Sequence, residues 1–278
     1  MSDGSVPQLK APAGTCDCHI HTYDHTFPTA PTAVVTPPDA AVGDYLKMCT
    51  KMGIERTVLV QASAYGKDNR LLLRDMATMG PSRARGIVVV DDSVTDEQLD
   101  RLTKLGVRGI RFFMLAGAPL PLSSLETMAA RVAPFGWTIN FQCDGRELAD
   151  HEARLKALPT TVTIDHQGKF LEPVEPDHPG FKALLRLLDT GKVWYKLAAP
   201  YETSKLGPPY YDDVGKLAKL LVKAAPERGL WASNWPYPMA GAKTPKDAWT
   251  LDMLLDWVPD EATRQKILVD NPAKLYGF

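Results

Sequence analysis

The chain has 278 residues, of which 45% are hydrophobic, a formal net charge of −1 and a pI near 6.6. This length and composition favour one globular domain with a sizeable core, and the absence of a long basic stripe argues against a nucleic-acid partner. The first 14 residues lack the apolar segment of a secretory signal, and no apolar run is long enough to span a membrane. Four cysteines without a C-x-x-C pair indicate a reduced, cytoplasmic protein with no membrane association.

The first predicted strand lies within TCDCHIHTYD, residues 15–24. Side chains alternate between the two faces of a strand, so Asp17, His19 and His21 share one face, and the other carries Cys16, Cys18 and Ile20. A proline-rich stretch, HTFPTAPTAVVTPPDA, follows and predicts an ordered loop over an active site. The His-x-His pair either holds a metal ion or acts on a substrate without one.

Strands and helices then alternate along the rest of the chain. Runs rich in β-branched and apolar residues predict strands at 56–63, 85–90, 107–113, 137–142, 161–166, 193–198 and 229–234. Helical periodicity predicts helices at 70–80, 95–106, 123–136, 146–158, 181–191, 212–225 and 245–258, and a last helix over 260–268. Thr95 is the expected N-cap of the second of these helices, and Gly106 lies just past its end.

Eight strands that alternate with helices predict parallel βαβ units and an α/β fold, a (β/α)8 TIM barrel that covers residues 1–278 as a single domain. An open doubly wound sheet is the main rival. That fold normally carries a glycine-rich phosphate turn after its first strand, and HTYDHTFP does not resemble one.

Active sites of such barrels lie at the carboxyl ends of the strands, where this sequence gathers polar residues. One buried histidine is usually a hydrogen-bonded core residue, but two at the end of one strand favour function. Arg108 and Arg111 cannot both point inward from a regular strand, so one is expected to pair with a neighbouring acid. Asp165 is either a structural cap or a site residue. The candidates at the strand ends are His19, His21, Gln61, Ser63, Tyr65, Asp68, Asn69, Arg108, Arg111, Asn140, Gln142, Asp144, Asp165, His166, Lys196, Tyr201, Glu202 and Asn234.

Several stretches, in order and at barrel spacing, resemble the amidohydrolase superfamily. They are DCHIH, VLVQASAYGKDN, GVRGIRFF, TIDHQGKF, VWYKLAAPYE, LWASNWPYP and VDNPAKLYGF. The similarity is closest to the lactone-processing branch, which includes 2-pyrone-4,6-dicarboxylate lactonases, 4-sulfomuconolactone hydrolases and D-galactarolactone isomerases. The resemblance implies an enzyme whose catalytic residues are His19, His21, His166 and Asn234. It implies a carboxylated lactone as substrate, bound by Ser63, Tyr65, Asp68, Asn69, Arg111, Asn140, Gln142, Lys196 and Tyr201.

One position departs from the superfamily pattern. The superfamily usually places an aspartate after the last strand, where it binds metal and takes a proton from water, and this chain has Asn234 there. An amide carries no negative charge and is a poor base. Three histidines can hold zinc, so a metal-dependent hydrolase stays open, but an enzyme without metal or other cofactor is favoured.

Two reactions remain open within this branch. The intact His-x-His pair favours ring-opening hydrolysis, which is slightly preferred. Asn234 favours a lactone isomerase, because ring migration needs no activated water. An engineered Asp→Asn substitution would leave the same letters, and a non-catalytic barrel that binds an acidic metabolite is a further alternative. The oligomeric state and the identity of the lactone stay open.

Overall fold

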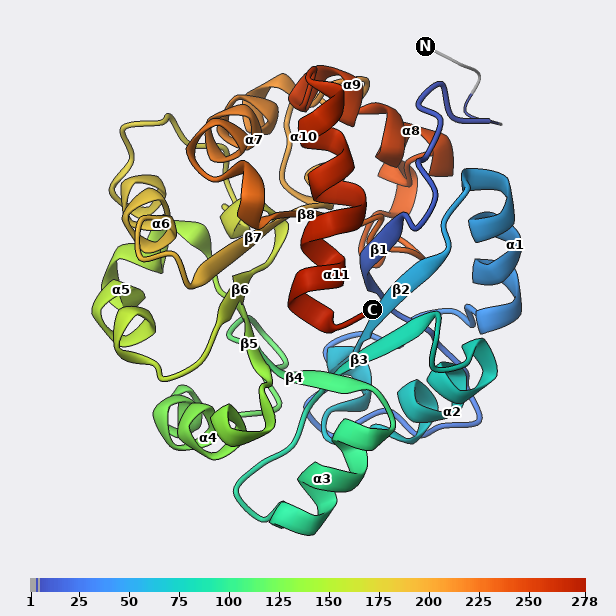
Figure 1. Cartoon of the computed structure of the whole chain (residues 1–278), viewed down its shortest axis with the longest axis vertical. Helices are drawn as coiled ribbons and strands as arrows, with labels where there is room; N and C mark the ends of the chain where they lie inside the picture. The colour runs from blue at the N-terminus through green and yellow to red at the C-terminus, as the bar shows by residue number, and fades with distance from the viewer. Residues whose placement is uncertain (1–3, 5) are drawn as a thin grey trace.

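Eight parallel strands follow one another in chain order around a barrel in the computed structural model, which describes residues 4 and 6–278 (Figure 1). The strands are β1 (Cys16–Ile20), β2 (Arg56–Val60), β3 (Ala84–Val88), β4 (Val107–Phe113), β5 (Thr138–Gln142), β6 (Val162–Ile164), β7 (Val193–Leu197) and β8 (Gly229–Trp231). The predicted (β/α)8 barrel is confirmed.

Helices surround the strands on the outside of the barrel (Figure 1). The helices that follow the first seven strands are α1 (Val42–Met52), α2 (Arg70–Met79), α3 (Asp96–Lys104), α4 (Leu125–Val132), α5 (Leu148–Ala157), α6 (Pro179–Leu188) and α7 (Asp212–Ala224). After β8 come α8 (Asp247–Asp252), α9 (Leu254–Trp257), α10 (Glu261–Gln265), the π-helical turn η9 (Lys266–Asp270) and α11 (Asn271–Tyr276). Thr95 caps α3 as predicted, and Gln98 completes a capping box with it.

Five strands end earlier than the sequence pattern predicts, and β2, β3 and β7 end one to three residues short. β6 stops at Ile164 and β8 at Trp231, whereas the patterns extend to residues 166 and 234. The last residue of each of these two predicted ranges has a backbone conformation that a strand cannot contain, since His166 has φ 52° and Asn234 has φ 60°.

The segment that follows β8 closes the barrel against β1. The backbone N–H of Asn234 donates to the carbonyl of His19 at 3.0 Å, and the N–H of His21 donates to the carbonyl of Trp235 at 2.8 Å. Asp17 strengthens the seam, because its Oδ1 accepts from the N–H of Ser233 at 2.9 Å. Closure thus draws the end of β1 and the residues after β8 together.

The C-terminal helix covers the amino ends of the strands. Arg85 on β3 and Arg108 on β4 both donate to the carbonyl of Tyr276, at 3.1 Å each, and α11 lies across this end of the barrel in Figure 1. The opposite end, where the strands' carboxyl ends lie, is free for a site. Within the described part of the chain, no helix has the length and apolarity needed to cross a membrane.

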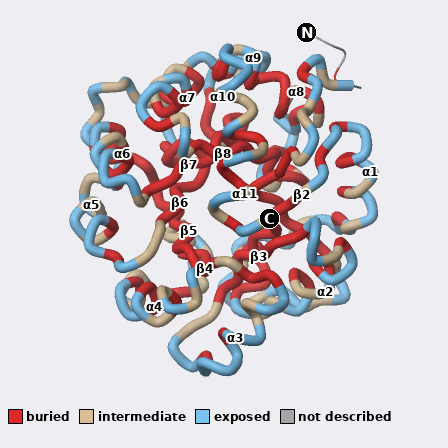
Figure 2. Tube along the Cα trace, viewed as in Figure 1, coloured by how far each residue is buried: buried red, intermediate tan, exposed pale blue. Residues whose placement is uncertain are grey.

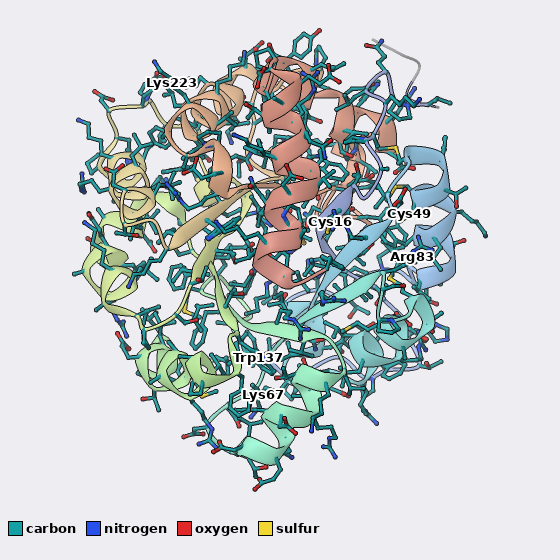
Figure 3. All side chains as sticks on the ribbon, viewed as in Figure 1. Cys16, Cys49, Lys67, Arg83, Trp137 and Lys223 are labelled. Carbon is teal, nitrogen blue, oxygen red and sulfur yellow. The ribbon has the colours of Figure 1, made fainter. Side chains whose placement is uncertain are left out.

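The core fills the barrel and the layer between strands and helices. Burial is concentrated along the strands and on the inner sides of the helices, as Figure 2 shows. Trp137, labelled in Figure 3, is fully buried, and its Nε1 donates to Thr103 Oγ1 at 2.8 Å. All four cysteines are buried and free.

Candidate active site

A cavity of about 310 Å³ opens at the carboxyl ends of the strands. Its apolar cover includes Val34 and Val35 from the proline-rich stretch, and Pro238 and Met239 from the loop after β8. That stretch therefore covers the site, as the sequence predicts. The polar residues of the wall are His21, Tyr23, Ser63, Arg111, Gln142, His166, Lys169, Glu202 and Asn234.

Three of these wall residues have left-handed backbone conformations. His166 (φ 52°), Lys169 (φ 51°) and Asn234 (φ 60°) are not glycines, and such a conformation costs on the order of 1 kcal/mol for a residue with a Cβ. Hydrogen bonds within the turn after β6 and to the next strand hold this backbone: the N–H of Lys169 donates to the carbonyl of His166 at 2.9 Å, and Gln167 Oε1 accepts from the N–H of Ala198 at 3.0 Å. Strain of this kind gathers at functional sites, and here it aims three polar side chains at one cavity.

His19 and His21 are hydrogen-bonded to each other. The contact of His21 with a backbone carbonyl determines which ring nitrogens donate and which accept. His21 Nδ1 lies 2.7 Å from the carbonyl oxygen of Val60, which can only accept, so this nitrogen carries the proton. Burial lowers the pKa of both rings, that of His19 to about 3, so both are neutral. His21 Nε2 is then an acceptor, and His19 Nε2 donates to it at 3.2 Å. This leaves His19 Nδ1 as an acceptor.

Lys196 donates to that free acceptor. Its Nζ lies 3.2 Å from His19 Nδ1, 3.1 Å from Asp165 Oδ1 and 3.3 Å from Asn140 Oδ1, and all four side chains are fully buried. Although burial opposes ionisation, the Lys196 ammonium holds the pKa of Asp165 well below its usual range. Asp165 makes no capping hydrogen bond with the turn that it begins. It is the counter-ion of Lys196 instead.

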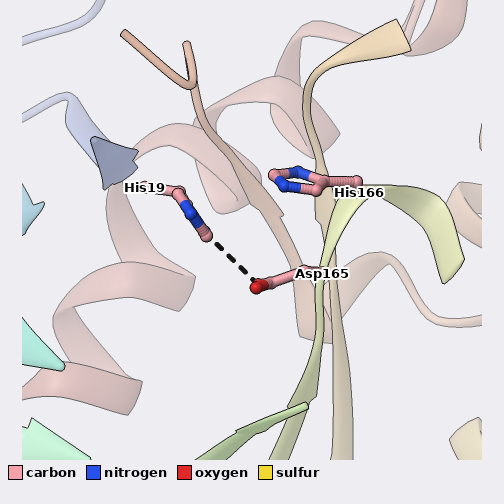
Figure 4. Close-up of side chains that lie close together, drawn as sticks. All are labelled: His19, Asp165 and His166. Atoms are coloured by element: carbon pink, nitrogen blue, oxygen red, sulfur yellow. Dashed lines mark ion pairs between the residues drawn. The ribbon is translucent and has the colours of Figure 1, made fainter. Parts of the chain in front are cut away.

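A divalent metal ion does not fit this set of residues. His19, Asp165 and His166 each offer a ligand atom within 4.8 Å of one another. Figure 4 shows the three side chains, with a dashed line for the contact of 3.4 Å between His19 Nδ1 and Asp165 Oδ1. However, His19 Nδ1 and Asp165 Oδ1 already bind the Lys196 ammonium, and Asn234 offers no negative charge. Two of the three ligand atoms are therefore already occupied.

Arg111 is the buried cation of the cavity wall. Its terminal nitrogens donate to the carbonyl of Gln61 at 2.8 Å and to Gln142 Oε1 at 3.0 Å, while its Nε has no partner. No ion pair joins it to a carboxylate within the described residues. Arg108, on the same strand, donates to backbone carbonyls at the other end of the barrel, of which that of Thr103 lies 2.9 Å away. The expectation that one of these arginines pairs with an acid is therefore wrong, since the partners of both are carbonyl or amide oxygens.

Two hydrogen bonds fix the orientation of the Asn234 side-chain amide. Nδ2 donates to the Tyr201 hydroxyl at 2.8 Å and to Glu202 Oε1 at 2.9 Å, while Oδ1 is buried with no partner. The carboxylate can only accept, so this orientation of the amide follows from its partner. Asn234 thus keeps one acceptor for a hydroxyl group of a ligand.

Lys169 and Glu202 form an ion pair on the cavity wall, with Lys169 6% and Glu202 13% exposed. Burial and the nearby charge of Arg111 lower the pKa of Lys169, and the contact with Glu202 favours its charged form. Since Lys169 and Glu202 neutralise each other, the positive charge of Arg111 is the net charge of the wall.

The other predicted site residues lie in three places. Ser63 and Gln142 line the cavity, whereas Asn140 and Lys196 lie behind it and Tyr201 supports Asn234. Three residues of the loop after β2 bind the loops themselves, and none of them belongs to the wall. Tyr65 Oη donates to the carbonyl of Asp24 at 3.1 Å, Asp68 pairs with Arg70, and Asn69 Nδ2 donates to the carbonyl of Val89 at 2.8 Å.

The candidate set of the sequence omits Tyr23 and Lys169, and it names Glu202 without a role. Lys169 follows His166 by three residues, and Glu202 directly follows Tyr201, so both occupy loops that already carry candidates. Their position in these loops was the signal that could have identified them as site residues. Their ion pair joins loops after two different strands, a contact that only the folded chain makes.

Comparison with known proteins agrees with this geometry. The amidohydrolase family model matches residues 16–278. The chain is 35% identical to the D-galactarolactone isomerase of Agrobacterium fabrum over 98% of this chain and 94% of that protein. It is 34% identical to the 2-pyrone-4,6-dicarboxylate hydrolase of Comamonas testosteroni over 98% and 93% of the two chains. A crystal structure of an Agrobacterium tumefaciens protein, 34% identical, superposes with a TM-score of 0.91 over 98% of this chain and 99% of that one. On these grounds, the chain belongs to the amidohydrolase family.

Proposed function

We propose that this protein is an enzyme that acts on a small carboxylated lactone in the cavity at the carboxyl ends of the strands. The observation that carries the proposal is Arg111, a buried guanidinium on the cavity wall with no carboxylate partner in the described chain. A buried charge is costly unless it is paired, and a guanidinium matches a carboxylate with two hydrogen bonds. The substrate's carboxylate is the missing partner.

His166 is the proposed acid and base of the reaction. It lines the cavity, its Nδ1 has no hydrogen-bond partner, and burial lowers its pKa, so the ring is neutral and able to accept a proton. His19 and His21 use their ring nitrogens in the chain between Lys196 and Val60. We therefore infer that they position the site and tune its charge.

The geometry favours ring migration over hydrolysis. The reason to prefer hydrolysis was the intact His-x-His pair, and both nitrogens of His21 are bound within the protein. Asn234 Oδ1 offers an acceptor that suits a substrate hydroxyl. His166 takes the proton of that hydroxyl, whose oxygen bonds to the acyl carbon. The old ring C–O bond then breaks, and its oxygen receives the proton.

Hydrolysis is the second candidate, with water in place of the substrate hydroxyl. The identity of 34% to a 2-pyrone-4,6-dicarboxylate hydrolase supports it, as the identity of 35% to a D-galactarolactone isomerase supports the first. Neither reaction needs a metal in this proposal, since Lys196 supplies the buried positive charge. The four free cysteines support a reducing, cytoplasmic location.

An NMR assay of the purified protein tests both candidates at once. The substrates are lactones of sugar diacids and the lactones of pyrone and muconate carboxylates, each with and without a chelator. Ring migration gives an isomeric lactone, and hydrolysis gives a ring-opened acid. Activity on neutral lactones that equals activity on carboxylated ones would overturn the proposal, because Arg111 would then have no anionic partner.

A further inference from the structure

The Lys196 ammonium has a full set of acceptors. Its three N–H groups match His19 Nδ1, Asp165 Oδ1 and Asn140 Oδ1 at 3.1–3.3 Å, and none of the four side chains is exposed. Lys196 extends from β7 in the wall of the barrel and has no route to solvent. It is therefore a fixed cation of the barrel interior.

The same acceptors belong to a cluster with the chemistry of a metal site. His19, Asp165 and His166 bring their ligand atoms within 4.8 Å of one another, and imidazole with carboxylate is a ligand set that suits zinc and cobalt (Figure 4). Two atoms of this cluster, Asp165 Oδ2 and His166 Nδ1, are buried and have no hydrogen-bond partner. Such unmet acceptors normally bind a water molecule or an ion.

The ammonium opposes a second cation at this cluster. It lies 3.1 Å from Asp165 Oδ1, so an ion bound by the same carboxylate and by His19 would lie within a few Å of Lys196 Nζ. Two like charges at that distance repel strongly in a buried environment, and one carboxylate cannot neutralise both.

We propose that Lys196 is a built-in substitute for a metal ion, and that the His19, Asp165 and His166 cluster is a latent divalent-metal site which Lys196 blocks. The ammonium neutralises Asp165 and fixes the proton positions of the two histidines, as a bound cation would. Removal of this one positive charge should open the site to zinc or cobalt. The inference concerns metal binding by the chain itself and does not depend on the proposed reaction.

Two variants test the inference, Lys196→Ala and Lys196→Leu. The first makes space for an ion and a water molecule, and the second removes the charge with less loss of volume. Zinc binding is measured by equilibrium dialysis, and cobalt binding by the visible absorption that reports nitrogen and oxygen ligands. Each variant should bind one equivalent about 10- to 100-fold more tightly than the parent, a change as large as the loss of supporting contacts causes at metal sites.

The controls locate the new site. Lys169→Met removes the lysine of the cavity wall, whose partner is Glu202, and should bind zinc no better than the parent. Adding Asp165→Asn to Lys196→Ala removes the anionic ligand and should abolish the gain. If it does not, the metal lies elsewhere and the inference is wrong.

Other outcomes also decide the matter. Folded Lys196 variants with parental metal affinity would overturn the proposal, and so would a parent protein that holds one tightly bound ion with Lys196 intact. A variant that unfolds without metal should refold when zinc is added, because the ion replaces the lost counter-charge of Asp165. Failure of zinc to restore folding to both variants would count against the latent site.

Discussion

Two buried cations of the barrel differ in what neutralises them. Lys196 lies behind the cavity, 3.1 Å from Asp165 Oδ1, and its hydrogen bonds are complete. Arg111 lies on the cavity wall, equally buried, and its oxygen partners are an amide and a carbonyl that carry no net charge. The protein supplies a counter-ion for Lys196 and none for Arg111. The anion that pairs with Arg111 is therefore expected to come from the substrate.

The largest expected effect tests whether the reaction takes place in the cavity that Arg111 and His166 line. His166→Asn should lower kcat by about 10²–10⁴-fold, the usual contribution of a positioned acid or base. Asparagine suits this position because it tolerates the left-handed backbone better than most residues, and His166 has φ 52°.

The matched control for that variant is His151→Asn. His151 is on α5 and packs against Phe141, with ring centroids 5.5 Å apart, outside the cavity. Steady-state kinetics and thermal melting should be measured on both variants. If the two lose activity equally, or if His166→Asn loses it only through unfolding, then His166 does not act in the reaction.

Asn234→Asp should change which product forms. A carboxylate here adds a base that can activate water, so hydrolysis should appear or rise by as much as about 10²–10⁴-fold while ring migration falls. The new carboxylate would lie near Glu202 Oε1, which is 2.9 Å from Asn234 Nδ2, and two adjacent carboxylates raise the pKa of one of them. Hydrolysis should therefore increase with pH.

The double variant Asn234→Asp with Glu202→Gln removes that repulsion and should shift the rise in hydrolysis to lower pH. Product ratios by NMR separate the alternatives. A parent that interconverts lactones well is an isomerase, and a parent that is nearly inactive until the aspartate is introduced is a disabled hydrolase. Less ring-opened acid from Asn234→Asp than from the parent would mean that Asn234 itself orients the substrate or the water.

Arg111→Met addresses the unpaired cation directly. Loss of a charge-assisted pair with the substrate carboxylate should cost about 1.5–3 kcal/mol of binding, which is about a 10- to 150-fold rise in KM. The melting temperature should fall little, because removal of a buried charge without a counter-ion offsets the loss of the two hydrogen bonds to Gln61 and Gln142.

Arg108→Met is the control on the same strand. Its guanidinium donates to the carbonyls of Tyr276 and Thr103 at the closed end of the barrel, so this variant should lose stability and keep its KM. Kinetics with carboxylated lactones and melting curves should be compared for the pair. The reverse pattern, with KM unchanged and stability lost in Arg111→Met, would make Arg111 a structural residue.

The fold was predictable from local patterns, and part of the site was too. Alternation along one strand placed Asp17 and His19 on one face, where they bind Ser233 and Lys196 inside the barrel. Position after a strand indicated His166 and Asn234, because polar residues at the ends of apolar runs are costly unless they have a use.

The assignment of partners could not be predicted. Whether Lys196 faces a substrate or an acid depends on Asp165, which comes from a neighbouring strand and lies 31 positions earlier in the sequence. Tyr65 was a reasonable ligand residue by position, yet its hydroxyl binds the backbone of Asp24 across the loop, 41 residues away. Sequence pattern gives the direction of a side chain from its own strand, and only the closed barrel decides which side chain it meets.

The last expected effect is on stability and concerns the neutral buried histidines. Burial holds the pKa of His19 at about 3 and lowers those of His21 and His166, whereas in the unfolded chain a histidine titrates near 6.5. As pH falls below 6.5, the unfolded chain binds protons that the folded protein does not, so stability is lost. Between pH 7.5 and 5.5 each of these rings should cost about 1.4 kcal/mol of the free energy of unfolding.

Three other groups act in the opposite sense and limit the net change. Burial lowers the pKa of Lys169 to about 7, so the folded protein gains a proton, and stability, as pH falls through that value. Burial raises the pKa of Asp17 to about 6, so the folded protein gains a proton, and stability, as pH falls through that value. His25 is exposed and pairs with Asp39, which raises its pKa, so its contribution is lost as pH rises.

Urea unfolding at pH 7.5, 6.5 and 5.5 should show a net decrease in stability for the parent and nearly the same decrease for His25→Asn. A flat or rising profile would mean that a buried ring is already charged in the folded state. If that ring is His19, it could not accept a hydrogen bond from Lys196. The hydrogen bonds of Lys196 would then be incomplete, and it would no longer differ from Arg111 in this respect.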